Sequence, residues 1–107
     1  MIKLPWISFN VKEPYEHLIK YGMVYTMRRQ RKQGSKIEVF RLGKRIGLAS
    51  VQKIKYVPYS QLETLLSEFV SQSGFKKLED WLEKIYRMYG KKANNLYLYK
   101  VTLEKVC

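Results

Sequence analysis

The stretch Tyr21-Gly-Met-Val-Tyr-Thr-Met-Arg-Arg-Gln-Arg-Lys32 contains the clearest structural signal in the chain. Its first two residues end a helix, and from the fourth residue on the side chains alternate between two faces. One face carries Val24, Thr26 and Arg28, and the other carries Tyr25, Met27 and Arg29. A period of two predicts a β-strand that is buried on one face.

This predicted strand leads into a dense basic cluster. Four cations lie within five residues: Arg28, Arg29, Arg31 and Lys32. A guanidinium group binds phosphate with a planar fork, and a neighbouring aromatic face can stack on a base. The cluster is therefore typical of a grip on a phosphate chain. The alternative is a solvated strand end whose charge only keeps the protein soluble.

Composition indicates a single folded domain, residues 1–107, with a polyanionic partner. The chain has 107 residues, of which 46% are hydrophobic and 14% aromatic, so a core can form without disulfides or metal. The formal charge of +12 is uneven: residues 1–60 carry 13 Lys and Arg against 3 acids, and residues 61–107 carry 8 against 6. Such asymmetry favours nucleic acid as the partner, ahead of an anionic membrane.

Cysteine content and hydropathy give no reason to expect secretion or a membrane. The only cysteine is Cys107, so no disulfide can form within the chain. No apolar run approaches the ~18 residues of a membrane-spanning helix. The start, Met1-Ile-Lys-Leu-Pro-Trp6, lacks the apolar core of a signal peptide. We therefore expect a soluble cytoplasmic protein that makes no membrane contact.

The remaining elements are predicted from periodicity and from helix ends. Pro14 suits the first turn of a short helix that stops at Gly22. Two apolar helical stripes follow, the first after a capping box at residues 60–63 and the second with acids early and bases late. Gly47 indicates a bend or bulge in a long strand. The predicted strands cover residues 6–9, 24–29, 36–41, 46–57 and 96–106.

The predicted order of elements is β-α-β-β-β-α-α-β. Because regular βαβ repeats are absent, this order favours an α+β fold, a small and mostly antiparallel β-barrel or curled sheet with flanking helices. The basic strand and the strand that follows it are expected to form a hairpin, in which neighbouring strands lie ~5 Å apart. Eight cations would then share one surface: Arg28, Arg29, Arg31, Lys32, Lys36, Arg41, Lys44 and Arg45.

Catalytic and metal-binding constellations are scarce. His17 is the only histidine, and a lone helical histidine is usually a surface or packing residue. No Cys–His or His–carboxylate spacing indicates a metal site, and the sequence has neither a Gly-rich phosphate loop nor a nucleophile elbow. We therefore expect no metal and no other cofactor.

Nearly the whole chain resembles the ASCH domain, a member of the PUA-like barrel superfamily. Four segments in order carry the resemblance: Trp6–Phe9 before a short helix, Ile19–Gly22 followed by Tyr25-Thr-Met-Arg28, Gly47–Val51 after a hairpin, and Ser73-Gly-Phe75 before an acidic helix, Tyr89-Gly90 and a last strand. The resemblance implies a PUA-like β-barrel with a cleft beside the strand that carries Thr26 and Arg28. It also implies RNA binding or RNA-linked regulation.

Some small members of the family are amidohydrolases that act on acetylated cytidine, and some have been linked to RNA cleavage. In the hydrolases a lysine precedes the threonine of the Thr-x-Arg motif by three residues, and a glutamate lies shortly before the last helix. The matching positions here hold Met23 and Ser73, with Lys20 nearby. The resemblance thus implies that hydrolysis of this type is not expected, although Thr26 and Arg28 match the motif.

The favoured interpretation is a non-catalytic RNA-binding module. Its predicted phosphate contacts come from Arg28, Arg29, Arg31, Lys32, Lys44 and Arg45. A cleft lined by Lys20, Tyr25 and Thr26 would meet a base or a ribose. The alternatives are a small enzyme of the kinds found in the family, DNA binding by the same surface, and a pure protein-interaction domain.

Overall fold

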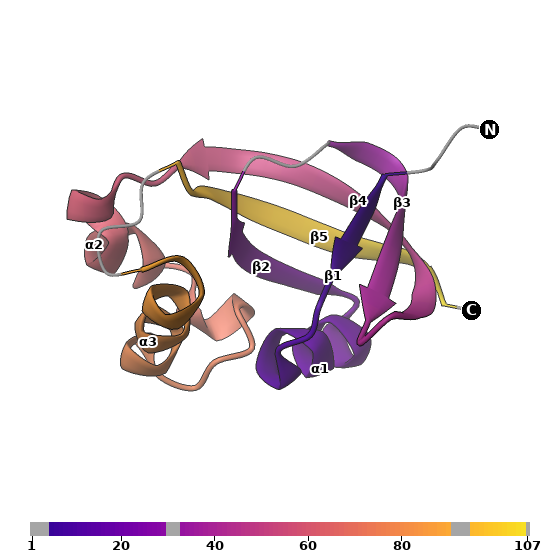
Figure 1. Cartoon of the computed structure of the whole chain (residues 1–107), viewed down its shortest axis with the longest axis horizontal. Helices are drawn as coiled ribbons and strands as arrows, with labels where there is room; N and C mark the ends of the chain where they lie inside the picture. Colours follow the sequence, from indigo (N-terminus) through magenta and orange to yellow (C-terminus); the bar gives the residue numbers. More distant parts are fainter. Residues whose placement is uncertain (1–4, 30–32, 91–94, 107) are drawn as a thin grey trace.

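The described residues form five strands and three α-helices, and their order confirms the predicted β-α-β-β-β-α-α-β (Figure 1). The computed structural model describes residues 5–29, 33–90 and 95–106. The strands are β1 (Trp6–Ser8), β2 (Met23–Arg28), β3 (Gly34–Arg41), β4 (Lys44–Tyr56) and β5 (Tyr97–Val106). The helices are α1 (Lys12–Tyr21), α2 (Leu62–Leu66) and α3 (Leu78–Tyr89), and two 3-10 turns flank α2, η1 (Tyr59–Gln61) and η2 (Val70–Gln72).

The strands form one curled sheet in the order β1-β3-β4-β5-β2 (Figure 1). β1 runs parallel to β3, and the other neighbouring pairs are antiparallel. The predicted α+β class is therefore confirmed, but the sheet is mixed. The sheet is curled, and β1 and β2 are its two edges in the described part of the chain. Because these edges do not pair with each other, the sheet is a half-barrel.

The hairpin predicted between the basic strand and the next strand is wrong. β2 pairs with β5 instead, with Tyr25 opposite Lys100 and Arg28 opposite Tyr97. β4 and β5 both lie between β2 and β3 in the sheet. The basic residues of β2 and those of β3 are therefore close in sequence but do not lie on neighbouring strands.

One face of the sheet packs with α1 to form the first hydrophobic core. Leu18 of α1 meets inward side chains from every strand: Ile7, Val24, Ile37, Val39, Ala49, Val51, Tyr99 and Val101. Tyr97 and Leu103 pack against the same cluster. The face predicted for the last strand is therefore confirmed, because alternate residues of β5 point to the same side.

The opposite face of β2 and β5 packs against α2 and α3, which lie together beside one end of the sheet (Figure 1). Met27 and Leu98 come from the strands, and the helices contribute Leu62, Leu66, Trp81, Leu82 and Ile85. Tyr25 belongs to this face, since its ring stacks on that of Phe69 at 5.0 Å with 22° between the planes. β2 and β5 thus separate two cores.

Two glycines are required by close backbone contacts. A Cβ at Gly47 would overlap the backbone carbonyl of Lys105, and a Cβ at Gly74 would overlap that of Glu13. Next to Gly47 the pairing of β4 with β3 skips Ile46, so a bulge is present there as predicted. The second contact places the segment before α3 directly against the first turn of α1.

The helix ends are only partly as predicted. α1 stops at Gly22, whose φ of 76° is left-handed and whose N–H donates to the carbonyl of Leu18. The capping box predicted at residues 60–63 is wrong, because η1 covers Ser60 and α2 begins without a side-chain cap. In the part of the chain that the structure describes, no helix has the length and apolar character needed to cross a bilayer.

Candidate nucleic-acid interface

Thr26 and Arg28 lie side by side at the end of β2 and are both buried. Their side chains are only 6% and 8% exposed, because they share the inward face of β2 with Val24. The Nε–H of Arg28 donates to Thr26 Oγ1 at 3.2 Å, and the guanidinium carbon lies 4.9 Å from the centre of the Phe9 ring. Phe9 directly follows β1, so this contact links the two edges of the sheet.

A narrow crevice of about 30 Å³ opens over this pair. Thr26 and Arg28 line it together with side chains of α3: Trp81, Lys84, Ile85, Met88 and Tyr89. Its described lining includes the cations Arg28 and Lys84 and no carboxylate. A space of this size holds about one or two waters, so a phosphate oxygen can enter but a base cannot.

The rim of the crevice combines cations with an aromatic ring. Arg29 is exposed, and its guanidinium carbon lies 5.6 Å from the centre of the Tyr89 ring. Tyr89, the last residue of α3, is half-buried, and Met88 beside it is 50% exposed. We define the crevice interface as Thr26, Arg28, Arg29, Lys84 and Tyr89. Sequence reasoning assigned no binding role to the two α3 residues: Tyr89 was predicted as part of the apolar stripe of that helix, and Lys84 had no signal beyond its place on the same helix.

The other predicted phosphate contacts lie elsewhere or cannot be placed. Lys44 and Arg45 lie at the start of β4. Arg28 lies near the other end of β4, because it is opposite Tyr97 of β5, which is opposite Tyr56 of β4. Arg45 Nε also pairs with Glu38 Oε1 at 3.1 Å. The predicted contacts Arg31 and Lys32 lie outside the described residues. The described basic residues are therefore not assembled by a hairpin of β2 and β3.

The three residues predicted to line one cleft are separated. Thr26 lines the crevice, but Tyr25 points to the other face of β2 and stacks on Phe69. Alternation along the strand makes this unavoidable, because consecutive side chains point to opposite faces. Lys20 lies on α1 and lines a different hollow. Only Thr26 thus stands beside Arg28 as predicted.

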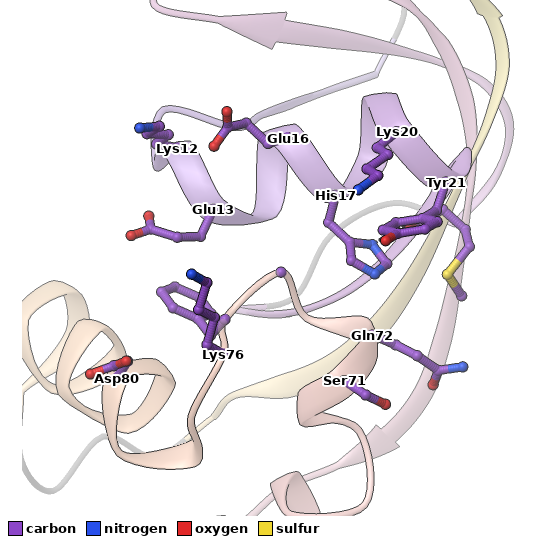
Figure 2. Close-up of a pocket in the computed structure, with 13 residues that line it drawn as sticks. Lys12, Glu13, Glu16, His17, Lys20, Tyr21, Ser71, Gln72, Lys76 and Asp80 are labelled. Carbon is purple, nitrogen blue, oxygen red and sulfur yellow. Dashed lines mark hydrogen bonds between the residues drawn. The ribbon is translucent and has the colours of Figure 1, made fainter.

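This second hollow, which we call the α1 cleft, is larger, at about 920 Å³ (Figure 2). His17, Lys20 and Tyr21 extend into it from α1, and Ser71 and Gln72 lie across from them. Its described lining balances three lysines against three carboxylates: Lys12, Lys20 and Lys76, and Glu13, Glu16 and Asp80. A polyanion would therefore meet as much repulsion as attraction there, so the smaller crevice suits phosphate better.

His17 has a structural role at the edge of the α1 cleft. Its Nδ1 lies 2.7 Å from the carbonyl oxygen of Met23. A carbonyl can only accept, so Nδ1 carries the proton and donates it to that bond. The imidazole ring also packs 4.6 Å from the ring of Tyr21. These contacts tie the end of α1 to the start of β2.

The two positions that correspond to the hydrolase lysine and glutamate do not form a catalytic pair. Met23 lines the α1 cleft. Ser73 is fully buried, and its hydroxyl donates to the carbonyl of Val70 at 2.7 Å and accepts from the N–H of Phe75 at 3.1 Å. Its side chain therefore holds the turn before α3 and is engaged within the fold.

No protein-family model, no curated protein and no solved structure matches this chain. Function is therefore argued from the chemistry of the crevice interface.

Proposed function

We propose that the chain is an RNA-binding module whose phosphate contacts centre on the crevice interface. The observation that carries this proposal is the charge of the crevice: Arg28 and Lys84 line it without a described carboxylate, and Arg29 extends over Tyr89 at its rim. Phosphate oxygens bind guanidinium and ammonium groups, and a tyrosine ring can stack on a base.

The charge of the whole molecule supports the same partner. A formal charge of +12 on 107 residues attracts a polyanion over several ångströms and speeds its association. Binding releases counterions from the nucleic acid, so affinity should fall steeply as salt rises.

The fixed geometry of Arg28 is the second support. Its guanidinium plane is held by the bond to Thr26 and by the ring of Phe9. A group that is already ordered loses less rotational freedom when it binds, so a held arginine favours binding over a mobile one.

We propose RNA rather than DNA because the sequence resembles ASCH domains. The same proposal includes a PUA-like fold and a cytoplasmic location for the protein. The crevice chemistry alone serves the phosphates of either nucleic acid. A matched comparison of single-stranded RNA, transfer RNA and duplex DNA therefore decides between them. The module needs no metal or cofactor for these contacts.

The test is a fluorescence-anisotropy titration with variants of the rim. Arg29→Ala and Lys84→Ala should each weaken RNA binding by about fivefold and reduce the salt slope by about 0.7. Arg87→Ala is the matched control, because it removes the same charge from an exposed position of α3 where Arg87 pairs with Glu83 at 2.8 Å. Equal losses in all three variants would show that only total charge matters and would remove the proposed interface.

A further inference from the structure

β4 extends past the first residue of β3, so its last residues pair with β5 on one side and with no strand on the other side among the described residues (Figure 1). Its last described partner on β3 is Gly34, opposite Val51. Beyond that point β4 pairs with β5 up to Tyr56, opposite Tyr97. The backbone N–H of Lys53, which has no β3 partner in the described residues, donates to the side chain of Gln33 at 2.9 Å.

A row of side chains crosses three strands at this open end. Arg28 of β2 lies opposite Tyr97 of β5, which in turn lies opposite Tyr56 of β4. Residues directly opposite each other in antiparallel strands point to the same face, so the three side chains share one face of the sheet, with Arg28 buried and Tyr56 exposed. The ring centres of Tyr56 and Tyr97 are 5.4 Å apart. Because Arg28 belongs to both, the row adjoins the crevice interface.

The tyrosines of this row differ in exposure from those that only pack. Tyr99, the next residue of β5 on the same face, is fully buried, and its ring lies 6.4 Å from the Tyr97 ring. Tyr56 is 46% exposed, and Tyr97 is half-buried. Tyr56 and Tyr97 therefore present aromatic area to solvent, whereas Tyr99 does not.

Cations accompany these rings. Lys53 Nζ lies 4.4 Å from the centre of the Tyr97 ring, and Arg28 is the cross-strand neighbour of the same residue. The strand segments around this row, residues 24–29, 52–56 and 97–101, contain no aspartate or glutamate. An aromatic ring beside a lysine is a combination found in sites for single-stranded nucleic acid.

We propose that Tyr56 and Tyr97 form a stacking platform for the unpaired bases of single-stranded RNA, with a phosphate held by Lys53. The proposal rests on the proposed function and deepens it, because it names the strand state that the module recognises. Bases in a duplex already stack on each other and hide their faces. The platform therefore selects single strands, and because every base has a π-face, it tolerates different sequences.

The deciding experiment compares Tyr56→Ala with Tyr56→Phe on a single-stranded RNA and on a fully paired RNA of equal length. Tyr56→Ala should weaken single-strand binding by about fivefold to a hundredfold, whereas Tyr56→Phe should bind within about twofold of the parent. Binding to the paired RNA should be the same for all three proteins. Tyr56→Leu, which keeps apolar area but has no ring, should match Tyr56→Ala.

Thermal unfolding of each variant separates stacking from folding, because the ring of Tyr56 also packs on Tyr97. If Tyr56→Ala unfolds early, Tyr56→Leu decides. A folded Tyr56→Leu that binds single strands as tightly as the parent overturns the platform. If Arg29→Ala weakens binding while both ring-less variants do not, the platform fails and the crevice interface stands. A parent protein that binds no RNA instead overturns the proposed function itself.

Discussion

The buried pair of Thr26 and Arg28 yields a prediction that the structure quantifies. Replacing Thr26 by Val keeps the shape of the side chain and removes the oxygen that accepts from Arg28 Nε. A hydrogen bond to a charged group contributes about 1.5–3 kcal/mol. At 3.2 Å this bond is at the long end of the ordinary range, so we expect a loss of about 1.5 kcal/mol of unfolding free energy.

Urea denaturation followed by tryptophan fluorescence measures this loss, since Trp81 lines the same crevice. With a slope of about 1.5 kcal/mol/M, the midpoint should fall by about 1 M. Thr64→Val, at an exposed position of α2 outside the crevice interface, makes the same chemical change and should leave the midpoint nearly unchanged.

A double-mutant cycle isolates the pair from every other contact of Arg28. Thr26→Val, Arg28→Met and the double variant should show a coupling of about 1 kcal/mol or more, because either single change already breaks the hydrogen bond between the two side chains. Coupling below about 0.3 kcal/mol, the level of independent sites, would refute the view that Thr26 holds the arginine. RNA binding should then weaken more for Arg28→Met than for Thr26→Val.

Three further predictions concern the frame around the interface. Gly47→Ala should destabilise the protein by about 1–3 kcal/mol or more in urea denaturation, because its Cβ would overlap the Lys105 carbonyl; an unchanged midpoint would contradict that contact. His17→Phe should cost about 1 kcal/mol through the lost bond to Met23, with RNA affinity retained; a loss of RNA affinity without a loss of stability would instead assign the α1 cleft a binding role. Arg45→Ala should change RNA affinity by less than about twofold, since Arg45 pairs with Glu38 at the far end of β4 from the tyrosine row; a tenfold loss in the same anisotropy assay would restore the basic turn to the interface.

The strands were predictable from the sequence because their signal is local. Val24 and Thr26 alternate with Tyr25 and Met27 whatever the partner strand is, and the structure buries the first two on one face. The order of elements follows from the same local patterns together with Gly22, which stops α1 by its left-handed backbone. The bulge beside Gly47 was predictable because glycine in a strand indicates a close backbone approach.

Partner choice was not predictable, and the site depends on it. Nothing in the basic stretch specifies that Arg28 lies opposite Tyr97, which is 69 residues away in the chain. Because Tyr97 lies opposite Tyr56, the pairing of β2 with β5 aligns Arg28 with both tyrosines. A hairpin of β2 and β3 would instead have placed cations of β3 beside Arg28. The contacts of Arg28 with Phe9 and of Arg29 with Tyr89 likewise join segments that are distant in sequence.

The capping box failed for a different reason. The motif around Ser60 is short, and a 3-10 turn takes up the residues that a capped α-helix would use. Tyr25 was placed in the cleft on its chemistry alone, although its own alternation with Thr26 already put it on the opposite face. Periodicity was thus the better guide than residue type, because backbone geometry fixes the face before chemistry acts.

The affinity of the unmodified protein for a labelled single-stranded RNA, measured at several salt concentrations, shows whether the protein binds RNA as we propose. We predict submicromolar binding at low salt that exceeds binding to duplex DNA of equal length. We also predict a logarithmic salt slope of about −2 or steeper, from three or more phosphates that meet Arg28, Arg29, Lys84 or Lys53. Binding that is absent near physiological salt, or that is equal for both nucleic acids with a flat salt slope, would contradict this proposal.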